Sequence, residues 1–263
     1  MTGGATSVIV LAADRGPGDP LAVRAGVPGK VLVEIGGKSM LARVMEAVSA
    51  FAPDGRLLVV CRDDPAYAEA AGSGRAFQRI DPAAGPAASA LAAMGRLDPS
   101  DPVLLVTGDH PLLQPDWLQQ FVTRAAATGA DAVVGLADHA AIAARFPESR
   151  RTRYRFSDIS VCGTNLFYFA GVHGREVAEQ WRVFEANRKK PWKIVGRLGP
   201  WNLVRYLAGR LSLPAAMEAL SRRLGSRVGA VMVDAPEAAV DVDSHADLEL
   251  VTALIERRER DRA

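Results

Sequence analysis

The chain has 263 residues, of which 49% are hydrophobic and 24% are charged, and its formal net charge is +2. This length suits one large α/β domain with a sizeable core, and the near-neutral charge argues against nucleic acid as a partner of the whole chain. No apolar run approaches the roughly 20 residues of a membrane span, and the first residues lack the pattern of a signal peptide, so we expect a cytoplasmic protein without a transmembrane segment.

Short apolar runs alternate with helical patterns over the first half of the chain. The strand-like runs are 7–13, 56–61, 102–108, 131–136 and, near the end, 228–233. Helical periodicity marks 39–52, 86–97 and 115–130, and we expect Ser39 and Ser89, or residues near them, to cap the first two helices. Alternation of this kind predicts an α/β fold with a mostly parallel, Rossmann-like open sheet flanked by helices.

The pattern changes after about residue 137. The stretch 146–158 is polar and holds four arginines, 161–170 reads as a strand interrupted by Gly163 and Asn165, and amphipathic helices are expected at about 173–190, 199–209 and 213–224. The chain then returns to a strand, a tight acidic turn and a closing helix. We therefore predict a single domain, 1–263, with a helical insertion at about 140–227 that forms an acceptor-side subregion.

A long Gly/Pro-rich segment follows the first strand, in "IVLAADRGPGDPLAVRAGVPGKVLVEIGGKSML" (9–41). Ligands of open α/β sheets bind at the carboxyl ends of strands, and glycines there let backbone N–H groups approach phosphates. Gly16 supplies such freedom, while Arg15 and Lys30 add positive charge. We expect Lys30 to be exposed in the absence of ligand. Neither a P-loop nor a GxGxxG motif is present, and a merely flexible loop is the alternative interpretation.

Two acidic motifs are candidates for a metal site. In "LLVTGDHPLL" (104–113) a buried strand ends in Asp109, a position from which a carboxylate can hold Mg²⁺ against phosphates, although a turn or capping aspartate is the alternative. In "AAVDVDSHADLEL" (238–250), Asp241 and Asp243 are two apart and so share one face of an extended segment. Helix capping explains Ser244 and Asp247 but not both of those aspartates.

These motifs together resemble the MobA-like nucleotidyltransferases, which share the GT-A-type fold of sugar-nucleotide pyrophosphorylases. The family signature, approximately LAAGxGxRM…PKxLlplxGkpml, is matched by 8–41, the mid-chain acid before a proline by 104–113, and the closing motif by "DVDSHADL". The resemblance implies that Lys30 contacts the nucleotide phosphates and that Asp109 binds the catalytic Mg²⁺. It also implies Asp243 as the second metal ligand, with Asp241 as its neighbour.

The resemblance further implies a nucleotide site lined by Leu11, Ala12 and Ala13, with Gly85 and Ser89 near the base. Two departures stand out: Asp14 replaces the usual glycine, and a glycine separates Pro28 from Lys30. The insertion is also longer than in the molybdenum-cofactor enzymes, which argues against molybdopterin as the acceptor.

The expected function is Mg²⁺-dependent transfer of a nucleotide from an NTP, CTP or GTP in the first place, to a phosphorylated small molecule, with release of pyrophosphate. Asn165 and Gly163 are the expected acceptor-binding residues, because an amide inside an apolar strand needs a partner. The arginines of 150–155 either bind the acceptor or form a solvated face. The basic segment 182–210, with its two tryptophans, either contacts a membrane or a lipid-linked acceptor or packs on the domain. A GT-A glycosyltransferase and a non-catalytic nucleotide-binding regulator are the alternatives.

Overall fold

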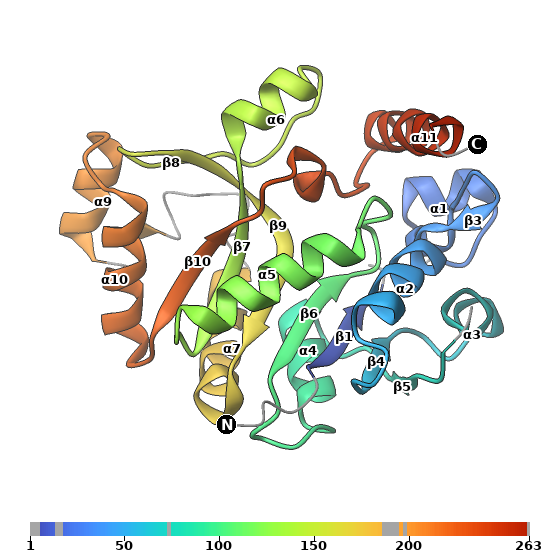
Figure 1. Ribbon diagram of the computed structural model, residues 1–263, viewed down its shortest axis with the longest axis horizontal. Coiled ribbons are helices and arrows are strands. Elements are labelled where there is room, and N and C mark those ends of the chain that lie inside the picture. The colour runs from blue at the N-terminus through green and yellow to red at the C-terminus, as the bar shows by residue number, and fades with distance from the viewer. Residues whose placement is uncertain (1–5, 14–17, 73–74, 186–194, 197–198, 262–263) are drawn as a thin grey trace.

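The computed structural model describes residues 6–13, 18–72, 75–185, 195–196 and 199–261. Its strands are Ser7–Leu11 (β1), Leu57–Val60 (β4), Gln78–Ile80 (β5), Val103–Thr107 (β6), Ala132–Asp138 (β7), Tyr154–Arg155 (β8), Ser160–Phe169 (β9) and Val228–Met232 (β10). They form one sheet in the order β10–β7–β9–β6–β1–β4–β5, with β8 paired to β9 (Figure 1). β9 is antiparallel to β6, β7 and β8, and the remaining pairs are parallel. The predicted α/β, mostly parallel sheet is confirmed.

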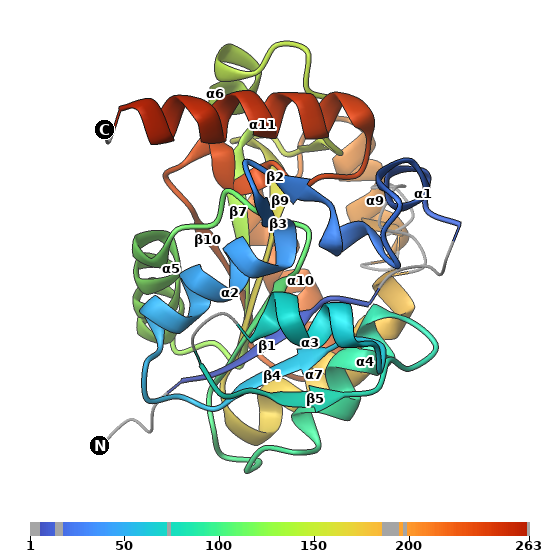
Figure 2. The same cartoon turned by 90° about the vertical axis from the view of Figure 1, so that its right-hand side faces the viewer.

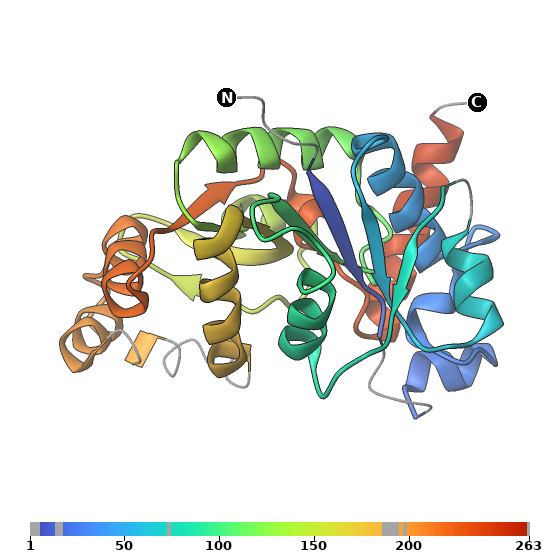
Figure 3. The same ribbon diagram turned by 90° about the horizontal axis from the view of Figure 1, so that it is seen from below.

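Helices cover both faces of this sheet, as Figure 3 shows. Successive residues of a strand point to opposite faces, so Val8 and Val10 of β1 join one buried cluster and Ile9 joins another. The first cluster packs under Met40–Phe51 (α2), Pro65–Ala71 (α3) and Pro115–Ala127 (α5). The second packs under Pro86–Met94 (α4) and Gly171–Glu185 (α7). Because β1 is buried on both sides, its sequence is continuously apolar from Val8 to Leu11.

The remaining elements gather at the carboxyl edge of the sheet or beside β10. They are Pro20–Ala25 (α1), Lys30–Leu32 (η1), Glu34–Ile35 (β2), Lys38–Ser39 (β3), His139–Arg145 (α6), Pro200–Leu207 (α9), Leu213–Leu224 (α10), Pro236–Ala239 (η2) and His245–Arg260 (α11). Figure 2 shows α11 crossing above the small β2–β3 hairpin, next to α1. The start of η1 and the turn before α11 therefore meet where β6 ends, as the contacts of Lys30 with Asp109 and Asp243 show.

Two expected helix starts had different outcomes. Ser39 caps α2 by accepting a hydrogen bond from the N–H of Ala42, as predicted. The expectation for Ser89 is wrong, because α4 begins at Pro86 with Gly85 as its N-cap and Ser89 lies inside the helix. Proline suits the first helical position, where its missing N–H costs nothing.

Three regions differ from the sequence-based expectation. The Gly/Pro-rich segment is not featureless, because α1 forms within it and is capped by the side chain of Asp19. β9 lies between β6 and β7, so residues 160–169 of the expected insertion belong to the sheet itself. The short elements β5, α3 and α6 were not anticipated, since their apolar runs are brief. Within the described ranges, every helix is too short or too polar to cross a bilayer.

Candidate active site

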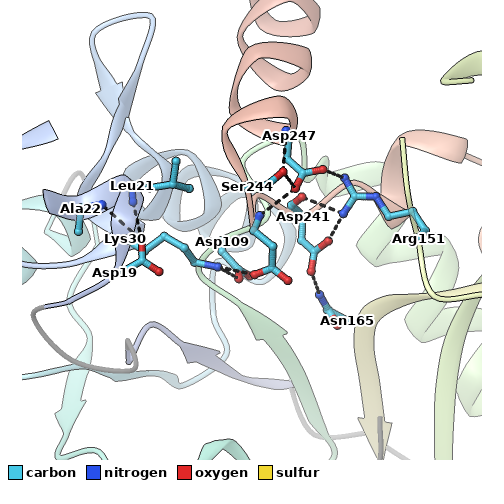
Figure 4. Close-up of polar contacts among 11 residues, drawn as sticks. Asp19, Leu21, Ala22, Lys30, Asp109, Arg151, Asn165, Asp241, Ser244 and Asp247 are labelled. Carbon is cyan, nitrogen blue, oxygen red and sulfur yellow. Dashed lines mark hydrogen bonds and ion pairs between the residues drawn. The ribbon is translucent and has the colours of Figure 1, made fainter. Parts of the chain in front are cut away.

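Lys30, Asp109 and Asp243 meet at the carboxyl edge of the sheet, although they come from distant parts of the chain (Figure 4). Lys30 opens η1, Asp109 follows β6, and Asp243 precedes α11. The Lys30 Nζ lies 2.7 Å from Oδ2 of Asp109 and 2.8 Å from Oδ1 of Asp243. One ammonium therefore bridges two carboxylates.

The environment of Lys30 corrects the expectation that this side chain is exposed. Only 12% of it is accessible, because the carboxylates and η1 enclose it. Burial by itself would lower the pKa of the ammonium, but Asp109 and Asp243 outweigh that effect and raise the pKa above its ordinary value. Lys30 therefore stays protonated, and its positive charge is paired with the carboxylates of Asp109 and Asp243.

Asp109 has an acceptor atom to spare. Its Oδ2 receives the Lys30 ammonium, while Oδ1 is buried and has no hydrogen-bond partner among the described residues. Its main-chain carbonyl accepts a hydrogen bond from the N–H of Val242 at 3.0 Å, which fastens the loop after β6 to the acidic turn. A buried carboxylate oxygen without a partner is costly unless a ligand or ion satisfies it.

Within the described part of the chain, Asp109, Asp241 and Asp243 form a group whose carboxylate oxygens lie within 4.8 Å of one another. Val242 is fully buried, so the two aspartates on either side of it project to the same side of the turn, as the sequence predicted. Oxygen ligands of this kind suit Mg²⁺. The residues therefore fit a divalent cation, and the unpartnered Oδ1 of Asp109 gives it a ready ligand.

Asp241 is engaged differently from the other two aspartates. Its Oδ1 accepts a hydrogen bond from Arg151, and its Oδ2 accepts one from the Nδ2 of Asn165 at 3.0 Å. Burial and the nearby charge of Asp109 raise the pKa of Asp241 to about 6, against the lowering effect of Arg151. Because both of its oxygens are occupied within the protein, Asp241 supports the site from beside it.

Asn165 lies at an irregular point of β9. The register between β7 and β9 shifts between Val134 and Leu136, and Asn165 has a left-handed φ of 56° at this bulge. Bulges re-aim side chains, and asparagine tolerates this backbone conformation better than most residues. The amide that the sequence singled out thus finds its partner in Asp241, while Gly163, two residues earlier, is exposed. Their roles as acceptor ligands stay predictions.

The expected nucleotide pocket is described in part. Leu11 and Ala12 end β1 beside Gly108, whose N–H donates to the Leu11 carbonyl at 2.8 Å. A Cβ on Gly108 would lie 3.2 Å from Ala12, so the glycine permits this close approach. Ala13 is exposed at the strand end. Arg15 and Gly16, like Asp14, lie outside the described residues.

A hydrogen bond between Ala83 and Ser89 holds the loop that precedes α4. Ser89 is buried, and its hydroxyl accepts a hydrogen bond from the N–H of Ala83 at 3.0 Å. Gly85 is half-buried at the start of the helix and leaves backbone groups at the carboxyl edge near β1. Ser89 therefore shapes the loop that was expected to read the base, and direct contact with the base stays a prediction.

Sequence reasoning did not identify the role of Arg151. Four arginines within six residues offered no signal to separate one from the others, yet Arg151 is 9% exposed whereas Arg150, Arg153 and Arg155 are exposed. The basic segment 182–210 is described mainly through α9, whose Trp201 and Leu207 are 71% and 70% exposed. Its other tryptophan lies outside the described residues, and contact with a membrane stays a prediction.

Known proteins share the sequence pattern and the fold of this chain. The family model described as the MobA-like NTP transferase domain matches residues 8–145. A hypothetical transferase from Thermus thermophilus superposes with a TM-score of 0.77 at 27% identity, over 92% of this chain and 99% of that one. No curated protein sequence matches the chain.

Two more distant structures share the fold. A CMP-2-keto-3-deoxy-manno-octonic acid synthetase in complex with CTP has a TM-score of 0.61 at 16% identity, over 97% of this chain and 100% of that one. Molybdopterin-guanine dinucleotide biosynthesis protein A from Archaeoglobus fulgidus has a TM-score of 0.53 at 17% identity, over 96% and 100%.

Proposed function

The chain belongs to the MobA-like NTP transferase domain family and is a nucleotidyltransferase, and we propose that it transfers a nucleotide from CTP or GTP to a phosphorylated small molecule. In this reaction an oxygen of the acceptor phosphate forms a bond to the α-phosphorus of the NTP. The bond between that phosphorus and the α–β bridging oxygen breaks, and pyrophosphate leaves. The product is an NDP-linked acceptor, and no side-chain nucleophile is needed.

The observation that carries this proposal is the bridge from Lys30 to Asp109 and Asp243 at the end of β6. A cation and two carboxylates at the carboxyl edge of an α/β sheet provide the charges that a metal–triphosphate complex requires. When the nucleotide is bound, Lys30 would turn its ammonium from the carboxylates to the phosphates and stabilise negative charge on the departing pyrophosphate. The catalytic residues are therefore Lys30 and Asp109.

Asp109 and Asp243 would hold Mg²⁺, because Oδ1 of Asp109 is buried without a hydrogen-bond partner among the described residues and Asp243 offers a carboxylate oxygen within 4.8 Å of the Asp109 carboxylate. Asp241 would stay beside them. When bound, Mg²⁺ would supply positive charge that offsets the negative charge of the triphosphate. The protein itself contributes positioning of two anions that repel each other, which is the main source of catalysis in phosphoryl transfer. Leu11, Ala12, Ala13, Arg15, Gly16, Gly85 and Ser89 complete the proposed nucleotide site.

The choice between CTP and GTP reflects the two distant relatives, of which one was crystallised with CTP and the other is named for a guanine dinucleotide. The acceptor would enter from the side of residues 140–227, where Gly163 and Asn165 lie and where Arg150, Arg153 and Arg155 are exposed. Guanidinium groups bind phosphate by paired hydrogen bonds, so these three are the proposed acceptor-side cations. The enzyme would work in the cytoplasm as one domain.

Pyrophosphate release from a panel of NTPs and phosphorylated acceptors tests the proposal, with UDP- and GDP-sugars included as donors for glycosyl transfer. We expect release that needs a divalent cation, an NTP and an acceptor together, and we expect Asp109→Asn to abolish it. Sugar transfer without pyrophosphate would identify a glycosyltransferase. NTP binding with no turnover on any acceptor in the panel would count against the proposed reaction.

A further inference from the structure

The guanidinium of Arg151 lies between the carboxylates of Asp241 and Asp247 and bonds both of them (Figure 4). Its Nε donates to the hydroxyl of Ser149 at 2.9 Å, and its Nη1 donates to the main-chain carbonyl of Asp241 at 2.9 Å and to that residue's carboxylate. Its Nη2 donates to Oδ1 of Asp247. With 9% of the side chain exposed, this guanidinium is buried between two carboxylates.

The second carboxylate, that of Asp247, also accepts hydrogen bonds from the turn that carries Asp243. Its Oδ2 accepts hydrogen bonds from the hydroxyl of Ser244 at 2.6 Å and from the main-chain N–H of Asp243 at 3.3 Å. Ser244 in turn accepts a hydrogen bond from the N–H of Asp247 and caps α11. Asp243 therefore lies between two residues that Arg151 bonds, Asp241 before it and Asp247 after it, and its N–H donates a hydrogen bond to the second of them.

We propose that Arg151 is a positioning residue, which clamps the turn 241–247 so that the carboxylate of Asp243 faces that of Asp109 across the metal site. This inference rests on the proposed function and assigns a role outside the matched residues 8–145. Arg151 touches neither substrate nor metal. It acts by holding in place an acidic turn whose like charges, on Asp241, Asp243 and Asp247, repel one another.

The two terminal nitrogens of the guanidinium, which bond two different carboxylates, explain why arginine suits this position. A planar guanidinium can bond Asp241 through one nitrogen and Asp247 through another, whereas a lysine ammonium is a point charge on a flexible stem. Arg124 has a different situation, because its side chain is 47% exposed and pairs with the exposed Asp234, which lies outside the turn 241–247. Arg124 is therefore the control.

The test compares Arg151→Met, Arg151→Lys and Asp247→Asn with Arg124→Met and the wild-type enzyme. Binding of Mn²⁺ alone is measured by electron paramagnetic resonance, and the Mg²⁺ concentration for half-maximal turnover is measured separately. We expect Arg151→Met to weaken both by about tenfold to a hundredfold, the usual effect of losing a residue that orients a metal ligand. Arg151→Lys and Asp247→Asn should fall between Arg151→Met and the wild type, and Arg124→Met should leave both quantities unchanged.

Asp109→Asn separates failure of this inference from failure of the proposed function. If Asp109→Asn loses Mn²⁺ binding while Arg151→Met keeps it at the wild-type level, the clamp is refuted and the metal site stands. If Asp109→Asn itself binds Mn²⁺ normally, the proposed metal site fails. A lower melting temperature for Arg151→Met with an unchanged Mg²⁺ requirement would make Arg151 a structural residue only and would refute the clamp. In that case Asp247→Asn should also leave the Mg²⁺ requirement unchanged.

Discussion

Replacing Lys30 by methionine removes the cation that joins Asp109 to Asp243. Their carboxylate oxygens lie within 4.8 Å of one another, so two negative charges would face each other. Their repulsion is about 3 kcal/mol at an effective dielectric constant of about 20. Asp243 is 51% exposed and partly screened by water, which reduces the expected loss of stability to about 1–2 kcal/mol.

The same substitution should have opposite effects on metal binding and on turnover. In the free protein Lys30 competes with any cation for the two carboxylates, so Lys30→Met should bind Mn²⁺ more tightly than the wild type. Divalent cations should also restore its stability. Turnover should nevertheless fall by roughly tenfold to a thousandfold, because about 1.4–4 kcal/mol of transition-state stabilisation is lost with a charged contact.

Urea denaturation in EDTA and in Mn²⁺, together with pyrophosphate release, measures these effects. Lys38→Met is the control, because Lys38 is 52% exposed and pairs with the exposed Glu46. Equal stability of Lys30→Met and wild type in EDTA would refute the reasoning from burial and charge. Weaker Mn²⁺ binding by the variant would show that Lys30 supports the metal site instead of competing for it.

Four further predictions follow from the same structure. Asp109→Asn should abolish metal-dependent turnover while the unfolding midpoint stays near wild type, and normal Mg²⁺ dependence would exclude Asp109 from the site. Asn165→Ala should raise the KM for the acceptor or lower kcat with little change in NTP affinity, and Asn165→Gly controls for the left-handed φ of 56°; loss of NTP affinity instead would place Asn165 at the nucleotide. Burial lowers the pKa of His110 to about 4, so stability should be lost as pH falls from about 6.5 toward 4, by up to about 3 kcal/mol. Urea unfolding at several pH values should show this loss in the wild type and not in His110→Gln. Vesicles rich in anionic lipid should co-sediment the wild type more than a double variant with Trp201→Ser and Leu207→Ser, and equal sedimentation would count against membrane contact.

The sequence alone was sufficient for the fold and for the three acidic and basic residues of the central bridge. Continuous apolar runs identified the buried strands, because a strand covered on both faces has no polar position. Strand ends meet at one edge of a parallel sheet, so residues that follow strands could be expected to gather there. Lys30, Asp109 and Asp243 were found in this way, together with the resemblance of their motifs to a known family.

The burial of side chains in loops could not be predicted in the same way. Lys30 appeared exposed because it follows a Gly/Pro-rich segment, but its enclosure depends on carboxylates 79 and 213 residues further along the chain. The position of β9 between β6 and β7 likewise depends on pairing across the whole sheet. Local periodicity carries no information on either, because both arise from contacts between distant segments.

Sequence by itself determined which residue types stand at the ends of the strands, since that follows from the alternation of apolar and polar positions. Only the tertiary structure decided which of these residues contact one another. It paired Asn165 and Arg151 with Asp241, left one oxygen of Asp109 without a partner among the described residues, and placed a lysine where a metal ion would be expected. The physical reason is that hydrogen bonds and ion pairs depend on distances of a few ångströms, which are set by how the sheet, the bulge in β9 and the turn before α11 pack together.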